Sequence, residues 1–294
     1  MLKQNFVATD FDGTITDDEA GVAPFKESTL EDFANRIGLP LGDIQRVYPA
    51  MEAKVLRLDA GLDDDSGIVM SPPGVYSTIT RVVRLIIDQL REDPGQLGLE
   101  PSKSVQTKLP ELGEERAFTN SLYKDNYHNA DTIFRPFALD YLQELDAIAK
   151  LVIITNSDAR AVMERMDLLK GAPFIPVIGD ANKRHRTPEL KVNPETIKIP
   201  GLKRSIHTRR GAYYDALGTS GAFNYPINKT LVSGDNLELD IVLPWAMGMK
   251  VALLDKGVPA RKYEAEFMHA QERATVGNDL EELTQGIKEL LLAA

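Results

Sequence analysis

The chain has 294 residues, of which 43% are hydrophobic and 27% are charged, and its formal net charge is -10. These values are ordinary for a globular protein with a core domain and a second, smaller unit. The negative charge argues against a nucleic-acid partner, because nucleic-acid binding depends on a basic surface. The absence of cysteine excludes disulfides, zinc–thiolate sites and cysteine nucleophiles.

No apolar stretch approaches the roughly 18 residues that cross a membrane, so we expect no membrane partner. The chain passes from Met1–Gln4 directly into an apolar run, and we therefore expect no signal peptide and a cytoplasmic protein. The sequence leaves the oligomeric state open. If the protein is a hydrolase, its nucleophile is an oxygen, since no cysteine is present.

The first predicted element is a buried strand over Phe6–Thr9, which ends at the sequence DFDGT of Asp10–Thr14. Open α/β sheets place their ligand sites at such strand ends. A turn at Gly13 would bring the carboxylates of Asp10 and Asp12 into one small volume. One carboxylate can then act as nucleophile while the other donates and accepts a proton. For this motif alone, the alternative is an ordinary acidic turn.

The next segment, to about Thr132, does not continue the alternation of strand and helix. It has apolar residues at helical spacing, which indicates a helical insertion. The connection over Asp93–Glu115 is rich in proline, glycine and charge and is expected to be a surface loop. The run Asp63–Asp65 is interpreted as a solvated turn rather than a metal site. The expected helices cover Ser28–Ile37, Gly42–Leu58 and Val75–Leu90.

Regular alternation resumes near Phe134. An amphipathic helix is predicted over Phe137–Ala149 and a buried parallel strand over Leu151–Ile154. A helix over Ala159–Leu169 and a third strand over Ile175–Ile178 follow.

Polar residues follow the second predicted strand. The Thr155 hydroxyl and the backbone N–H groups of Asn156 and Ser157, near a helix start, can bind an anionic oxygen. The alternative is simple N-capping of the helix by Ser157 or Asp158.

The region from Gly179 to Arg210 is the most basic part of the chain, which suggests a local anion site in an acidic protein. A small hairpin is expected around Pro200–Gly201, and a helix is expected to begin at Arg210.

A further hydrophobic strand, beginning at Thr230, ends at Gly234 and Asp235, and Asp240 follows five positions later. Carboxylates at this strand end could complete an oxygen-ligand site for Mg²⁺. A strand over Val251–Leu254 and a C-terminal amphipathic helix over Leu280–Leu292 complete the predicted elements.

These strand ends resemble the motifs of the haloacid dehalogenase superfamily, most of whose members are phosphatases. Asp10–Thr14 is similar to the first motif, Thr155 to the second, and Gly234–Asp235 with Asp240 to the fourth. The resemblance implies an α/β fold with a doubly wound parallel sheet, a Rossmann-like core, and a mainly helical cap. We expect the core to contain residues 1–16 and 131–294 and the cap to contain residues 17–130.

The resemblance also implies a chemistry. Asp10 would attack phosphorus to form an aspartyl-phosphate, and Asp12 would protonate the leaving alcohol and later activate water. Mg²⁺ would be held by the Asp10 side chain, the Asp12 backbone carbonyl and Asp235, with Asp240 as a supporting or water-mediated ligand.

The third motif of the superfamily is a lysine, sometimes an arginine, near the start of the helix that precedes the fourth motif. Arg210 fits this position best, because it begins the predicted helix before the Thr230 strand. Lys183, just after the third strand, is the rival, and Arg209 and Lys203 are further candidates.

The expected function is therefore that of a magnesium-dependent phosphomonoesterase acting on a small phosphorylated metabolite. Asp12 argues against the dehalogenase and phosphonatase branches, which lack an aspartate at this position. Two alternatives stay open: a phosphotransferase or mutase of the same superfamily, and a catalytically silent binding module that keeps the fold.

Overall fold

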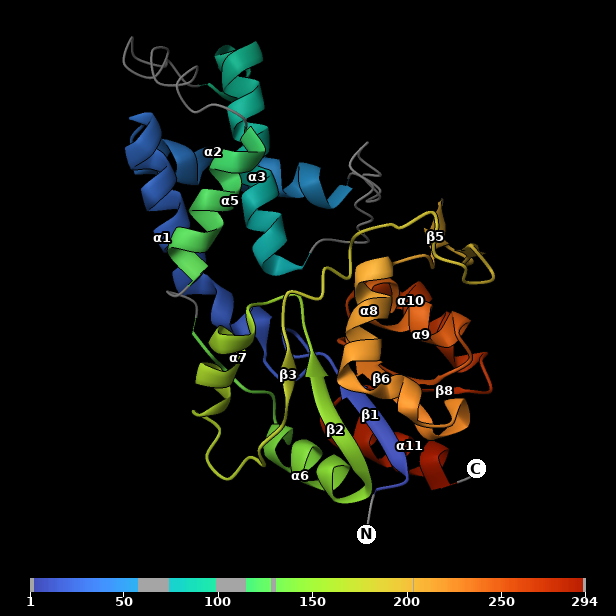
Figure 1. Cartoon of the computed structure of the whole chain (residues 1–294). Helices are drawn as coiled ribbons and strands as arrows, with labels where there is room; N and C mark the ends of the chain where they lie inside the picture. Colours follow the sequence, from blue (N-terminus) through green and yellow to red (C-terminus); the bar gives the residue numbers. More distant parts are fainter. Residues whose placement is uncertain (1–2, 58–73, 99–114, 128–130, 203, 293–294) are drawn as a thin grey trace. The chain divides into compact units, whose positions relative to one another are not determined.

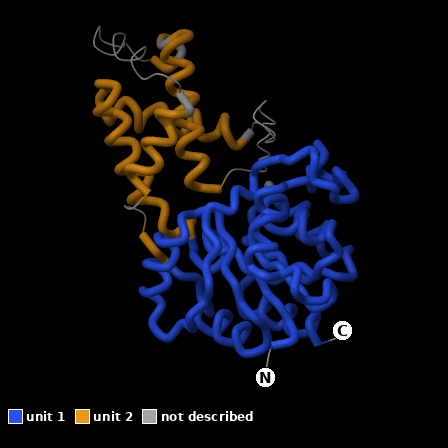
Figure 2. Tube along the Cα trace, viewed as in Figure 1, with its two compact units in different colours: residues 1–17, 61–71, 134–294 blue, residues 18–60, 72–133 orange. Residues whose placement is uncertain are grey.

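The computed structural model describes residues 3–57, 74–98, 115–127, 131–202 and 204–292. The chain divides into two compact units, which Figure 2 shows in different colours: residues 1–17, 61–71 and 134–294 form unit 1, and residues 18–60 and 72–133 form unit 2. None of the helices in the described ranges is long and apolar enough to cross a membrane.

Unit 1 is built on a six-stranded parallel sheet with the strand order β3-β2-β1-β6-β7-β8 (Figure 1). The predicted α/β fold with a doubly wound parallel sheet is confirmed. β1 pairs with β2 on one side and with β6 on the other, so the chain order reverses beside β1. In open α/β sheets this reversal opens a crevice at the carboxyl ends of the strands. The strands are β1 (Asn5–Thr9), β2 (Ala149–Ile154), β3 (Val177–Ile178), β6 (Thr230–Gly234), β7 (Lys250–Leu254) and β8 (Ala274–Gly277).

Side chains of the central strands alternate between two apolar layers, as expected for a sheet covered on both faces. Val7 of β1 packs in one buried cluster with Leu142 and Ile287. Phe6 belongs to a second cluster, which contains Leu217. The first layer is formed by α6 (Ala138–Ile148) and α11 (Leu280–Leu292), and the second contains α8 (Gly211–Ser220) and α9 (Val242–Ala246).

Several elements of unit 1 differ from the predicted ones. Helix α7 (Ala159–Met166) ends before the predicted Leu169. Strand β8 and helix α10 (Lys262–His269) were not predicted, because β8 is short and lacks a continuous apolar run.

The predicted hairpin is present as the antiparallel pair β4 (Thr196–Lys198) and β5 (Ser205–His207). Short 3₁₀ turns cover Ala222–Asn224, Ile227–Lys229 and Pro259–Arg261.

Unit 2 is helical in its described residues and has its own apolar core, which includes Phe25, Phe33, Ile86 and Leu122. Its first helix begins at Asp18 and passes through Pro24, although the sequence predicted a start at Ser28. Burial of Gly21 and Phe25 on one face accounts for this earlier start, because packing overrides local propensity. The run Asp63–Asp65 lies outside the described residues. The elements are α1 (Asp18–Ile37), α2 (Leu41–Arg57), α3 (Val75–Glu92), η1 (Pro94–Leu97) and α5 (Glu115–Asn126).

Candidate active site

Asp10 directly follows the carboxyl end of β1, next to β6. Its backbone N–H donates a hydrogen bond of 2.9 Å to the carbonyl of Ser233, which extends the pairing of these strands by one residue. A buried hydroxyl chain supports the same strand ends: Tyr141 Oη lies 2.9 Å from Thr9 Oγ1 and 2.7 Å from Ser233 Oγ. Burial raises the pKa of Tyr141 to about 12. Tyr141 therefore connects α6 to both strands as a neutral phenol.

The turn after Asp10 brings the first motif against the fourth. Gly13 has a φ of +82°, and a Cβ atom there would lie 2.9 Å from Asp235 Oδ2. Glycine is therefore required here for two reasons: it adopts the left-handed backbone conformation without strain, and it leaves space for the Asp235 carboxylate. The Thr14 hydroxyl lies 3.4 Å from Asp10 Oδ2 and 3.5 Å from Asp235 Oδ1. It thus lies between the two carboxylates.

The fourth motif returns a second aspartate to the end of β6. A π-helical turn over Leu237–Ile241 begins after Asn236, whose backbone N–H donates to Asp240 Oδ2 at 3.0 Å. A Cβ atom on Gly234 would lie 2.4 Å from Cβ of Asp240, so this position has no space for a side chain. Asp235 and Asp240 are held on the same side of the strand end.

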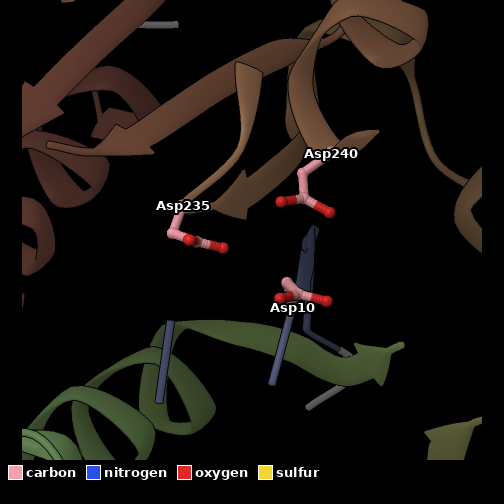
Figure 3. Close-up of side chains that lie close together, drawn as sticks. All are labelled: Asp10, Asp235 and Asp240. Carbon is pink, nitrogen blue, oxygen red and sulfur yellow. The ribbon is translucent and has the colours of Figure 1, made fainter. Parts of the chain in front are cut away.

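Asp10, Asp235 and Asp240 form a buried cluster of carboxylates that face one another (Figure 3). One oxygen from each lies within 4.8 Å of the others. Burial raises the pKa of Asp10 and of Asp240, and the neighbouring carboxylates add to this effect. Asp235 differs: burial acts to raise its pKa, but Lys256 and Arg261 outweigh burial and lower it.

Lys183 contacts two carboxylates of this cluster, those of Asp10 and Asp240. Its Nζ lies 2.7 Å from Asp10 Oδ1 and 2.7 Å from Asp240 Oδ1, and the side chain is 1% exposed. Burial acts to lower the pKa of Lys183, but the two carboxylates outweigh burial and raise it. The side-chain oxygen of Asn156 accepts a 2.8 Å hydrogen bond from the Lys183 backbone N–H. Asn156, which follows β2, thereby helps to position Lys183, which follows β3.

The sequence favoured Arg210 for the third motif, and the structure places Arg210 differently. Its guanidinium is fully buried, donates to the Lys183 carbonyl at 2.9 Å and lies 3.3 Å from Glu238 Oε1. The position of Arg210 before a predicted helix favoured it, but its guanidinium binds the backbone carbonyl of Lys183. Arg209 pairs with Glu195 at 3.1 Å, and Lys203 lies outside the described residues. Among the residues that the structure describes, the hydrogen-bonded cation of Asp10 is Lys183.

The donors of this cluster fit a divalent cation. Three buried carboxylates bring oxygen atoms of Asp10, Asp235 and Asp240 into one small space. Oxygen ligands of this kind suit Mg²⁺. Asp235 is also paired with Lys256 at 2.8 Å, a residue that sequence analysis missed. Lys256 lies just after the end of β7. A search for polar residues that follow predicted strands, which identified the other site residues, could therefore have identified Lys256.

Asp12 lies on the other side of the first motif, toward β2. Its Oδ2 accepts hydrogen bonds from Ser157 Oγ at 2.6 Å and from Thr155 Oγ1 at 3.2 Å, and its Oδ1 lies 3.2 Å from Arg165 Nη1. The Ser157 backbone N–H donates to Thr155 Oγ1 at 3.0 Å. Thr155, predicted to bind an anionic oxygen, contacts the Asp12 carboxylate. The expected metal ligand from Asp12 is its backbone carbonyl, and this role stays a prediction.

Comparisons with known proteins identify the fold. No protein-family model matches the sequence, and no curated protein matches it. The structure is similar to that of the HAD-hydrolase YfnB from Bacillus subtilis bound to magnesium, with 14% identity over 97% of this chain and 99% of that one and a TM-score of 0.50. It is equally similar to a predicted phosphoglycolate phosphatase from Haemophilus somnus 129pt, with 16% identity, coverage of 98% and 99%, and a TM-score of 0.50.

The chain has the fold of the haloacid dehalogenase superfamily, as the sequence motifs predicted. A 2-haloacid dehalogenase from Pseudomonas syringae pv. Tomato DC3000 is also similar, with 16% identity, coverage of 100% and 99%, and a TM-score of 0.45. At these identities the similarity shows the fold and does not select a reaction. The reaction is inferred from the side chains of this chain.

Proposed function

We propose that the protein is a magnesium-dependent phosphomonoesterase that acts through an aspartyl-phosphate on Asp10. The observation that carries the proposal is the cluster of Asp10, Asp235 and Asp240, two of which contact Lys183, with a further carboxylate, Asp12, two residues from Asp10. This arrangement supplies a nucleophile, a cation site and a proton donor at one strand end. The substrate is a small phosphorylated metabolite, and we place the enzyme in the cytoplasm.

In the first step, a carboxylate oxygen of Asp10 attacks phosphorus. The bond between phosphorus and the leaving oxygen breaks, and Asp12 gives its proton to that oxygen, which yields an alcohol and the aspartyl-phosphate. In the second step, a water oxygen attacks phosphorus while Asp12 takes the proton. The bond from phosphorus to Asp10 breaks, and inorganic phosphate and the free carboxylate are regenerated.

Lys183 opposes the rise in the pKa of Asp10 that burial causes, and its ammonium holds the carboxylate with Nζ 2.7 Å from Oδ1. Asp10, Asp235 and Asp240 would hold Mg²⁺, with the Asp12 carbonyl as a further ligand. When bound, the ion offsets the repulsion between carboxylates and phosphate and polarises the phosphoryl group.

Asp12 supports phosphate-ester cleavage over dehalogenation. An alkoxide leaving group needs a proton, whereas a halide leaves without one. Asp12 contacts the side chains of Thr155, Ser157 and Arg165 beside the nucleophile, in a position suited to proton transfer. A dehalogenase would gain nothing from this second carboxylate.

The test is a phosphatase screen over a broad set of phosphorylated metabolites with Mg²⁺, run with the parent protein and Asp10→Asn. We expect phosphate release by the parent and background activity in the variant. The matched control is Asp215→Asn, which alters an exposed carboxylate on α8 and should retain parental activity. Halide release from 2-haloacids without phosphate release from any ester would contradict the proposal, as would full activity of Asp10→Asn.

A further inference from the structure

Arg165 is a charged side chain with no role in the steps of the proposed reaction. It lies near the end of α7, 153 residues from Asp12 in the sequence, and its Nη1 lies 3.2 Å from Asp12 Oδ1. Both side chains are largely shielded from solvent, with 14% of Arg165 and 20% of Asp12 exposed. This is a specific contact between two distant parts of unit 1.

The packing of α7 directs Arg165 toward Asp12. Val162 is fully buried in the apolar cluster on one face of the sheet. Arg165 follows it by three residues and therefore lies on nearly the same side of the helix. Arg160 and Glu164 pair at 2.9 Å on the exposed side, where 85% and 64% of their side chains are exposed. The helix thus carries one inward-facing arginine and one solvent-facing arginine.

The contacts on Asp12 are divided between its two oxygens. Arg165 contacts Oδ1, whereas the hydroxyls of Ser157 and Thr155 contact Oδ2. Donors on both oxygens fix the rotation of the carboxylate about its terminal bond, which hydroxyls on one oxygen alone would not do. The guanidinium cannot be deprotonated in a protein, so it orients Asp12 without exchanging a proton with it.

We propose that Arg165 is a positioning residue for Asp12 and fixes the carboxylate for proton transfer to the leaving group. The inference rests on the proposed phosphatase function and adds to it a residue outside the sequence motifs. Its effect on kcat/KM is confined to the first step, in which Asp12 is the proton donor. Loss of Arg165 should therefore affect substrates according to how strongly their leaving groups need a proton.

The experiment compares phenyl phosphate with p-nitrophenyl phosphate, two substrates of similar shape. Phenolate is a poor leaving group that benefits from a proton, whereas p-nitrophenolate leaves readily without one. The measured quantity is kcat/KM, which reports steps up to formation of the aspartyl-phosphate and excludes its later hydrolysis. Both are measured with Mg²⁺ for the parent, Arg165→Met, Arg165→Lys and Arg160→Met.

For Arg165→Met we expect kcat/KM to fall about tenfold or more with phenyl phosphate and by less than about threefold with p-nitrophenyl phosphate, since general acid catalysis is typically worth 10²–10⁴. Arg165→Lys should restore part of the difference, because an ammonium on a flexible stem can still contact Oδ1. Arg160→Met removes the same charge from the same helix and should leave the ratio of the two substrates unchanged.

An equal loss with both substrates, or no loss, would overturn the role of Arg165 while the phosphatase function stands. An equal loss is the result expected of a residue that only stabilises the fold. If the parent protein releases phosphate from neither substrate nor from any ester in the metabolite screen, the proposed function fails, and the role of Arg165 fails with it.

Discussion

The two sides of the first motif differ in burial and in charge. On the β6 side, Asp10 shares a buried space with two further carboxylates and an ammonium that is 1% exposed. On the β2 side, Asp12 is 20% exposed and contacts two hydroxyls and one guanidinium. Two aspartates separated by one residue therefore lie in different electrostatic surroundings.

The difference matches two chemical tasks. A nucleophile and its metal ligands benefit from a buried, rigid site in which charges interact strongly. A proton donor and acceptor must exchange protons with water and substrate, which partial exposure permits. The two aspartates that carry these tasks are only two positions apart in the sequence.

Replacement of Lys183 by methionine tests the buried side. We expect kcat to fall by about 10²–10³, since removal of one preorganised electrostatic partner typically has this effect. Phenyl phosphate and p-nitrophenyl phosphate should be affected alike, because Lys183 acts on Asp10 rather than on the leaving group. The control is Arg209→Met, another candidate cation from the sequence, which should retain parental activity. The reverse result would assign the third motif to Arg209.

The metal side is tested by binding rather than activity. Asp235→Asn should weaken Mg²⁺ binding by about 100-fold or more, since even changes to groups around metal ligands cost 10–100-fold. Titration calorimetry measures this directly, and the Mg²⁺-induced rise in Tm of the parent should vanish in the variant. Asp215→Asn serves again as the exposed control. Equal Mg²⁺ affinity in all three proteins would place the ion elsewhere.

Ser157→Ala tests the exposed side with a small change. It removes the 2.6 Å hydrogen bond to Asp12 Oδ2 and leaves the contact with Arg165. We expect kcat/KM for phenyl phosphate to fall about two- to tenfold, which corresponds to the 0.5–1.5 kcal/mol of a typical hydrogen bond. Mg²⁺ affinity should not change. A loss of Mg²⁺ binding in this variant would show that the two sides are not separate.

Much of the site geometry could be predicted from the strand ends. Parallel strands present their carboxyl ends at one edge, so Asp10, Asp235 and Thr155 were expected at the same edge of the sheet. The pattern of apolar runs that end in aspartate, threonine or glycine was sufficient for this. The resemblance to a superfamily then assigned roles to these residues, and those roles remain proposals.

The cation that contacts Asp10 could not be predicted in the same way. Lys183 and Arg210 lie 27 residues apart and both are buried, but one contacts Asp10 and the other contacts the carbonyl of the first. Only the three-dimensional path of the segment between them decides which ammonium or guanidinium reaches the carboxylate. Arg165 has no local signal at all, because its partner lies in a distant part of the sequence.

In the proposed mechanism Asp10 forms a covalent bond to phosphorus, so the aspartyl-phosphate should be trapped when its hydrolysis is slowed. The experiment uses the Asp12→Asn protein with Mg²⁺ and p-nitrophenyl phosphate, because the first step then needs little acid assistance while hydrolysis of the intermediate lacks its base. After a rapid acid quench, mass spectrometry should find a hydroxylamine-sensitive phosphoryl group on the peptide that contains Asp10. Release of p-nitrophenolate with no phosphoryl group on Asp10, or with the group on another residue, would contradict the account.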